Sequence, residues 1–242
     1  MKNNRLHLYL LLFLVLLLAA GRALPGPGSV IAAPAQSPAS GLLAETVDLE
    51  LWRGHNGYDG VSDAWIESIN PDVANGADGG LHTLGSWKAE NTLIEFDLSD
   101  QAIPINATVT SATLALLPTW RGSSNTAQIT LHRLLQPWVE GSVTWNSRGD
   151  GHDWNWETDY EVTPLAVETI DVLQTYKNID ITEAVQGWVS VPSSNHGLLI
   201  RGNSVQLYFW SSERPSDADK PRLYITYEVT GTPVPEDTGT PT

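Results

Sequence analysis

The chain contains no cysteine, so disulfide bonds, thiolate metal ligands and a cysteine nucleophile are all excluded. Basic residues are also scarce, with 13 Lys and Arg against 28 Asp and Glu and a net charge of −15. Phosphate groups are bound by clustered Lys and Arg, so this deficit argues against nucleic acid and anionic membranes as partners. Such an acidic composition favours solubility outside the cell. It is also compatible with binding cations or uncharged partners.

The common catalytic motifs are missing as well. The sequence has no Gly-x-Ser-x-Gly elbow, no His-Glu-x-x-His and no phosphate-binding loop. His152 and Tyr160 offer a base and an acid for a lyase, but a glycosidase needs two carboxylates at a defined separation across a cleft. We therefore expect no enzyme, with a polysaccharide lyase or glycoside hydrolase as the less favoured alternative.

Residues 1–33 have the features of a signal peptide followed by a small-residue linker. Lys2 and Arg5 precede an apolar run from Leu8 to Ala20, which is shorter than the roughly 20 residues of a membrane-spanning helix. A signal peptidase could cleave after Ala23 or after Ala33, and the alternative is that the segment stays attached as an uncleaved signal anchor. We expect a protein that is secreted or held at a bacterial cell surface, with no membrane insertion of the mature domain. Removing this segment takes away three basic residues and no acidic one, which lowers the net charge to −18.

Residues 230–242 are rich in Thr and Pro and carry no side chain that could anchor a core. This composition predicts an extended linker. The segment between, residues 45–229, is long enough for one domain with a sizeable core.

The body of the chain shows the period-two alternation of half-buried strands. Ile94, Phe96 and Leu98 alternate with Glu95 and Asp97. Similar segments occur at residues 108–117, 128–134 and 197–201, with Pro and Gly between them. These patterns predict an all-β fold, a single jelly-roll-like β-sandwich.

Two further elements are expected near the C-terminal end. Ile181, Val185 and Trp188 follow helical spacing, which predicts a short helix after Asp180. Residues 207–211 and 221–227 both alternate and are separated by a polar segment of turn-forming residues. We interpret them as a β-hairpin that closes a sheet.

Several sequence blocks follow one another over residues 63–227. They are Asp63-Ala64-Trp65-Ile66, Asn75-Gly76, Leu84-Gly85, Leu93 to Ser99, Val109 to Leu114, Trp138 to Asn146, Asp180-Ile181-Thr182 with Trp188, Asn195 to Leu198, and the closing hairpin. In this order they resemble the DNRLRE domain, a secreted bacterial β-sandwich grouped with carbohydrate-binding modules. Glu95 departs from the family, which often has a basic residue there, and residues 154–156 lie in an unusual acidic insertion.

The resemblance implies an exported, non-catalytic module that binds carbohydrate or attaches to a cell surface. Its partner would be a polysaccharide or a cell-wall or surface component, and we expect a monomer. The sugar known for the family is an acidic polysaccharide, which this charge should repel, so a neutral ligand or one reached through calcium is expected. The alternative is a structural spacer or adhesion domain of a larger surface protein.

Tryptophan is abundant, with ten in the chain, and its indole face suits stacking on sugar rings. Trp154 and Trp156 would face one side of an extended loop, with Asp153, Asn155 and Glu157 beside them. This arrangement predicts an aromatic sugar platform with polar groups at its rim. A loop that folds back and buries both rings is the alternative.

The acidic loops also suit a structural calcium ion, since hard cations prefer oxygen ligands. Asp72, Asn75 and Asp78, spaced three residues apart, are the candidate ligands. The same residues are also ordinary turn formers, so the alternative is a loop without a metal.

Overall fold

The computed structural model describes residues 44–230. The predicted signal peptide and residues 231–242 of the predicted Thr/Pro linker lie outside this range. Within it, no helix has the length and apolar character needed to cross a bilayer.

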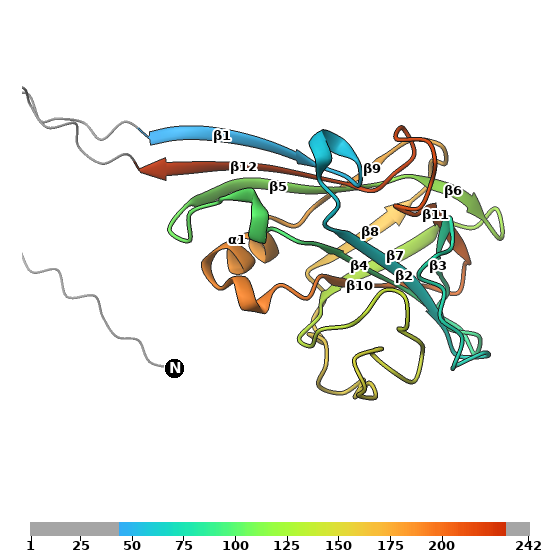
Figure 1. The fold of residues 1–242 in the computed structure, drawn as a ribbon. Coiled ribbons are helices and arrows are strands. Elements are labelled where there is room, and N and C mark those ends of the chain that lie inside the picture. Colours follow the sequence, from blue (N-terminus) through green and yellow to red (C-terminus); the bar gives the residue numbers. More distant parts are fainter. Residues whose placement is uncertain (1–43, 231–242) are drawn as a thin grey trace, which may run out of the picture. The chain divides into compact units, whose positions relative to one another are not determined.

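The described residues form three antiparallel sheets. The four-stranded sheet has the order β1 (Ala44–Leu51), β12 (Arg222–Thr230), β5 (Thr108–Leu116) and β9 (Lys177–Asp180). The five-stranded sheet has the order β2 (Val61–Glu67), β4 (Glu90–Phe96), β10 (Leu198–Gly202), β7 (Ala127–Arg133) and β8 (Ala166–Ile170). The three-stranded sheet has the order β3 (Gly80–Thr83), β11 (Leu207–Trp210) and β6 (Pro118–Arg121). Figure 1 shows the arrangement, which confirms the predicted sandwich-like all-β fold.

The main core lies between the sheets. It collects Leu114 and Ile225 from the four-stranded sheet, Ile94 and Ile200 from the five-stranded sheet, and Phe209 from the three-stranded sheet. These side chains are fully or almost fully buried, because alternate residues of each strand point inward.

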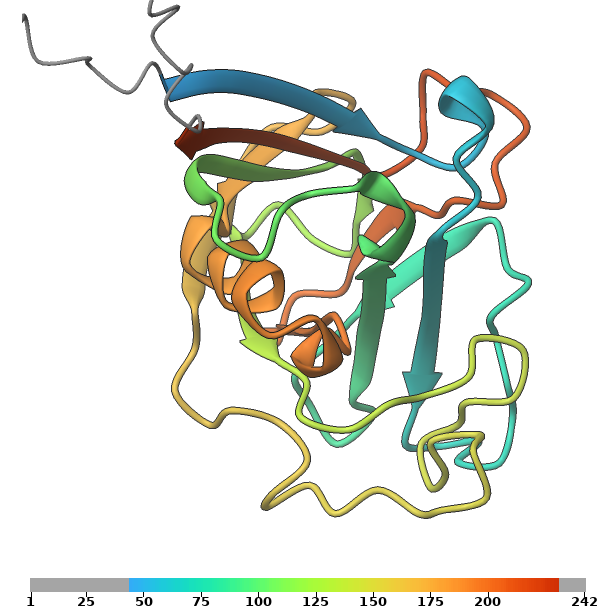
Figure 2. The same ribbon diagram turned by 60° about the vertical axis from the view of Figure 1, so that its left-hand side comes forward.

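A second core lies on the other face of the five-stranded sheet. Leu93 and Leu199 contribute to it from β4 and β10, so β4 is buried on both faces. The covering layer is the long connection between β7 and β8, which supplies Trp138, Val143 and Trp154. This connection is the looped segment below the sheet in Figure 2.

One α-helix occurs within the described range, α1 (Thr182–Ser190), and three short 3₁₀ turns lie at His55–Gly57, Ser99–Gln101 and Pro192–Ser194. The helix buries Val185 and Trp188, as its spacing predicted. Its side chains also continue the hydrogen bonding of β5 beyond the end of β9. Thr182 Oγ1 accepts from the Ala112 N–H at 2.8 Å, and Gln186 Oε1 accepts from the Val109 N–H at 2.8 Å.

The predicted closing hairpin is wrong. In the described part of the chain, β11 pairs with β3 and β6, whereas β12 pairs with β1 and β5. The polar segment between them crosses from one sheet to another. Its Ser212 N–H donates to Asp63 Oδ2 at 2.8 Å, so a buried contact rather than a tight turn holds this segment.

The first and last described residues, Ala44 and Thr230, are direct partners in the β1–β12 ladder. The three-stranded sheet lies at the opposite end of the domain from them (Figure 1). Its outer surface is therefore far from both ends of the described segment.

Candidate functional site

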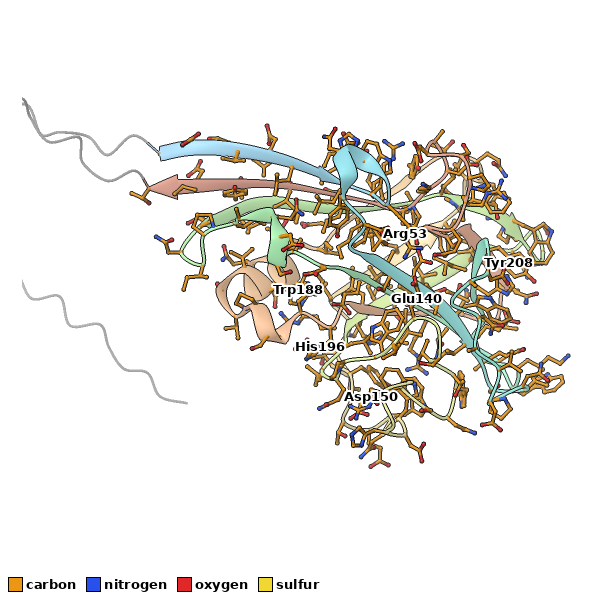
Figure 3. The ribbon with its side chains drawn as sticks, viewed as in Figure 1. Arg53, Glu140, Asp150, Trp188, His196 and Tyr208 are labelled. Carbon is orange, nitrogen blue, oxygen red and sulfur yellow. The ribbon has the colours of Figure 1, made fainter. Side chains whose placement is uncertain are left out.

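Four aromatic rings form a row across the three-stranded sheet and the neighbouring β2. Tyr208 on β11 is the direct partner of His82 on β3 and of Trp120 on β6. The ring centroids of His82 and Tyr208 are 3.9 Å apart, those of Trp65 and His82 4.0 Å, and those of Trp120 and Tyr208 4.7 Å. We call Trp65, His82, Tyr208 and Trp120 the aromatic row. Figure 3 labels Tyr208 near one end of the domain.

The alternation of β11 places this row outside the core. Leu207 and Phe209 are fully buried, whereas Tyr208 and Trp210 point to the other face. Trp120, at the end of the row, is 45% exposed. Cross-strand stacking fixes these rings without removing them from the surface.

A hollow of about 460 Å³ lies beside the row along β11. Gly80 stands opposite Trp210, where a larger residue would fill the space between Trp210 and the row. On the far side, the Arg214 guanidinium lies 3.8 Å from the Trp210 ring centroid. The hollow thus has aromatic side chains on two sides and glycine backbone between them.

Polar groups surround the hollow. Asp78 Oδ2 accepts from Trp65 Nε1 at 3.1 Å, and Asp78 Oδ1 accepts from the Gly80 N–H at 3.3 Å. Gln174 and Thr119 lie on the opposite rim. Arg214 pairs with Asp219 at 3.6 Å, while its Nε has no hydrogen-bond partner among residues 44–230. Carboxylate, amide and guanidinium groups around an aromatic hollow can bond the hydroxyl groups of a bound sugar.

The row itself is uncharged near neutral pH. Burial lowers the pKa of His82, although the charges of Asp78 and Glu67 oppose this effect. Burial raises the pKa of Tyr208 and of Glu90, whose carboxylate accepts two bonds from Gln206 at 2.8 Å. The site therefore offers neutral rings within an acidic surrounding.

The structure favours the folded-back alternative for the loop around Trp154 and Trp156. Trp154 is 8% exposed and belongs to the second core, and its Nε1 donates to the Thr144 carbonyl at 3.1 Å. Trp156 stacks on it at 4.8 Å and also contacts Trp145 and Tyr160. Trp154 is buried and Trp156 is half-buried, so the two rings do not share one exposed face, and sugar binding at this loop stays a prediction.

The predicted rim residues of that platform take part in the turns of the loop. Asn155 Oδ1 accepts from the Glu157 N–H at 3.1 Å, and Asp153 forms an isolated bridge with Ser147. Asp153, Asn155 and Glu157 are all exposed. Tyr160, proposed as a lyase acid, accepts a bond from Arg201 at 3.1 Å and packs against His132.

The three predicted calcium ligands each hydrogen-bond a residue outside their own set: Asp72 bonds Asn146, while Asn75 and Asp78 both bond Trp65. Asp72 Oδ1 accepts from Asn146 Nδ2 at 2.8 Å, Asn75 Nδ2 donates to the Trp65 carbonyl at 3.1 Å, and Asp78 bonds Trp65 Nε1. These bonds join the loop to its neighbours. Calcium binding at these residues stays a prediction.

Sequence reasoning missed the aromatic row, although part of its signal was visible. Alternation in residues 207–211 put Tyr208 and Trp210 on one face, opposite Phe209. The other members come from β2, β3 and β6, and a strand's partner across a sheet cannot be identified from its own sequence.

Comparison with known families matches residues 57–227 to carbohydrate-binding module family 96. No curated protein matches the chain significantly. The family match agrees with the expected carbohydrate-binding grouping and covers nearly the same segment as the sequence blocks, while the DNRLRE assignment itself stays a prediction. Because the match spans most of the chain, this protein belongs to carbohydrate-binding module family 96.

Proposed function

We propose that this chain is an exported, non-catalytic module that binds a neutral polysaccharide at the aromatic row and the adjoining hollow. The observation that carries this proposal is the 45% exposed ring of Trp120 at the end of the aromatic row, next to a hollow that Trp120, Tyr208 and Trp210 line together with polar groups. Sugar C–H groups stack on aromatic faces, and sugar hydroxyls bond polar groups at the rim.

The ligand is neutral because the surroundings are acidic. Asp78 lies at the hollow, Glu67 and Glu90 lie near the row, and Arg214 is already paired with Asp219. A polyanion would meet this acidic rim and the negative charge of the whole domain.

The test is retardation of the chain on native gels that contain a panel of neutral polysaccharides. We expect Trp120→Ala and Tyr208→Ala to weaken binding by about tenfold or more, because aromatic residues usually dominate such contacts. Gly80→Leu should have a similar effect, because its Cβ would lie 3.6 Å from His82 Nε2 without a clash and the rest of the side chain would extend into the hollow.

Trp87→Ala is the matched control, since Trp87 is 82% exposed and lies outside the row. The double variant Asp153→Ala, Glu157→Ala tests the loop predicted from sequence. Loss of retardation in this double variant alone would move the site to that loop. No retardation by any glycan would favour the alternative of a structural spacer.

A further inference from the structure

Three carboxylates meet inside the domain, away from the aromatic row. Asp63 lies on β2, Glu140 on the connection after β7, and Glu213 on the segment after β11. Each offers an oxygen within 4.8 Å of the others. We call these residues the acidic cluster; Figure 3 labels its Glu140 close to Arg53.

Asp63 is the most deeply buried member, with 0% exposure. Its Oδ2 accepts from the Ser212 N–H at 2.8 Å, and its own N–H donates to Glu140 Oε1 at 2.8 Å. Its Oδ1, however, has no hydrogen-bond partner among the described residues. A fully buried carboxylate oxygen without a partner is costly, so this oxygen is available to bind a proton or a cation.

One guanidinium faces the three carboxylates. Arg53 donates to Glu140 at 3.1 Å, to Glu213 and to the Val61 carbonyl. Burial raises the pKa of Asp63, as does the nearby charge of Glu213, and burial also raises the pKa of Glu140. A single Arg leaves negative charge uncompensated in a desolvated site, so a proton or a cation must balance it.

We propose that the acidic cluster is a divalent-cation site that takes calcium, with Asp63, Glu140, Glu213 and the Val61 carbonyl as ligands. All of these donors are oxygens, and calcium accepts irregular sets of carboxylate and carbonyl oxygens. Arg53 and the ion compete for the same oxygens.

Arg53 has another carboxylate within reach, outside the acidic cluster, in the exposed Asp59. The Arg53 side chain is partly exposed, and its Nε already lies 3.7 Å from Asp59 Oδ1 at the surface. A bound ion would therefore release Arg53 toward Asp59.

The site would also stabilise the proposed sugar-binding hollow. Ser211 is two residues before Glu213 of the acidic cluster and donates through Oγ to the Asp78 carbonyl at 2.6 Å. Asp78 and Arg214 both line the hollow. This consequence rests on the proposed function, whereas ion binding does not.

The experiment is calcium titration calorimetry on the chelator-treated chain, together with its melting temperature with and without calcium. We expect the wild type to bind calcium and to melt at a higher temperature. Arg53→Gln should bind calcium about tenfold more tightly or better, because the competing positive charge is gone.

Asp63→Asn should abolish calcium binding. If Asp63→Asn does not fold, Glu140→Gln takes its place, with the same expected loss. Asp72→Asn is the matched control, because it alters a carboxylate of the other predicted calcium site. Absence of calcium binding in both the wild type and Arg53→Gln would overturn the proposal. The proposal would also be overturned if Asp72→Asn lost calcium binding while Asp63→Asn or Glu140→Gln kept it. Glycan retardation of the chelator-treated wild type tests the sugar site separately.

Discussion

At the scale of single residues, Glu95 shows how burial changes the chemistry of a strand position. It lines a cavity of about 320 Å³ together with Trp188, Val189 and Ile103. Burial and the nearby charge of Asp97 raise its pKa to about 7. The folded state therefore holds this proton more tightly than the unfolded state does.

The direction of the pH effect follows from this raised pKa. The contribution of Glu95 to stability is fully present below its unfolded pKa and is lost as the pH rises toward about 7. The loss amounts to about 3 kcal/mol at most. We expect Glu95→Gln to be more stable than the wild type near pH 8 by a large part of this amount and similar to it near pH 4.5.

Urea denaturation of both proteins across this pH range measures the difference. Other groups titrate equally in the two proteins, so the difference between the two curves reports Glu95. If the difference in unfolding free energy between Glu95→Gln and the wild type stayed constant across this pH range, the raised pKa of Glu95 would be contradicted.

The sequence could indicate the chemistry of individual residues better than their exposure. It identified tryptophan as the side chain suited to sugar stacking, but Trp154 is buried and Trp120 is exposed. Their environments depend on distant residues, since Trp154 packs in a core with Leu93 and Leu199. Long-range packing of this kind has no local sequence pattern.

At the scale of elements, α1 protects the edge of β5. Where β9 ends, Thr182 Oγ1 accepts the Ala112 N–H, and Ala112 is fully buried. Thr182 also donates to Asp180 Oδ1 at 2.6 Å, which lowers the pKa of Asp180.

Thr182→Val keeps the size of the side chain and removes its oxygen. We expect a loss of about 1–3 kcal/mol in the free energy of unfolding, because the Ala112 N–H would lose its partner. Urea denaturation measures this loss. Glu183→Ala, next in the helix, is the control, since its exposed ion pair with Arg133 at 3.5 Å contributes little. Equal stability of the two variants would show that the Ala112 bond is unimportant.

Strand and helix positions were largely predictable, because their periodicity is local. The strands expected from the alternation of Ile94 to Leu98 and at residues 108–117, 128–134 and 197–201 correspond to β4, β5, β7 and β10. Pairing was less predictable. The supposed hairpin failed because β11 and β12 belong to different sheets, each completed by strands distant in sequence.

At the scale of the whole molecule, charge determines which polysaccharides can approach. The predicted mature chain carries a net charge of −18. We expect a polyuronate to bind at least about tenfold more weakly than the best neutral glycan at low ionic strength. Added salt should narrow this gap, because it screens repulsion beyond roughly 10 Å.

Gel retardation at two salt concentrations, with matched neutral and anionic polysaccharides, measures this difference. The neutral glycan is the control, since its binding should change little with salt. Stronger polyuronate binding at low salt would mean that a local basic site overcomes the net charge.

The sequence supported the fold class and the family grouping, because ordered blocks over residues 63–227 reflect the whole domain. It did not indicate the aromatic row or the acidic cluster. Both assemble side chains from segments up to about 150 residues apart, such as Asp63 and Glu213.

The direct pairing of Ala44 with Thr230 determines how the domain would respond to force. Traction that separates these two ends acts along the direction of the β1–β12 hydrogen bonds, which run across the strands. The β1–β12 hydrogen bonds would then break sequentially, starting at Ala44 and Thr230. Strand β1 would therefore detach first, at a low applied force. Traction between one end and a sugar held at the far three-stranded sheet would instead load the sandwich along its length, so the domain would resist that pull much better.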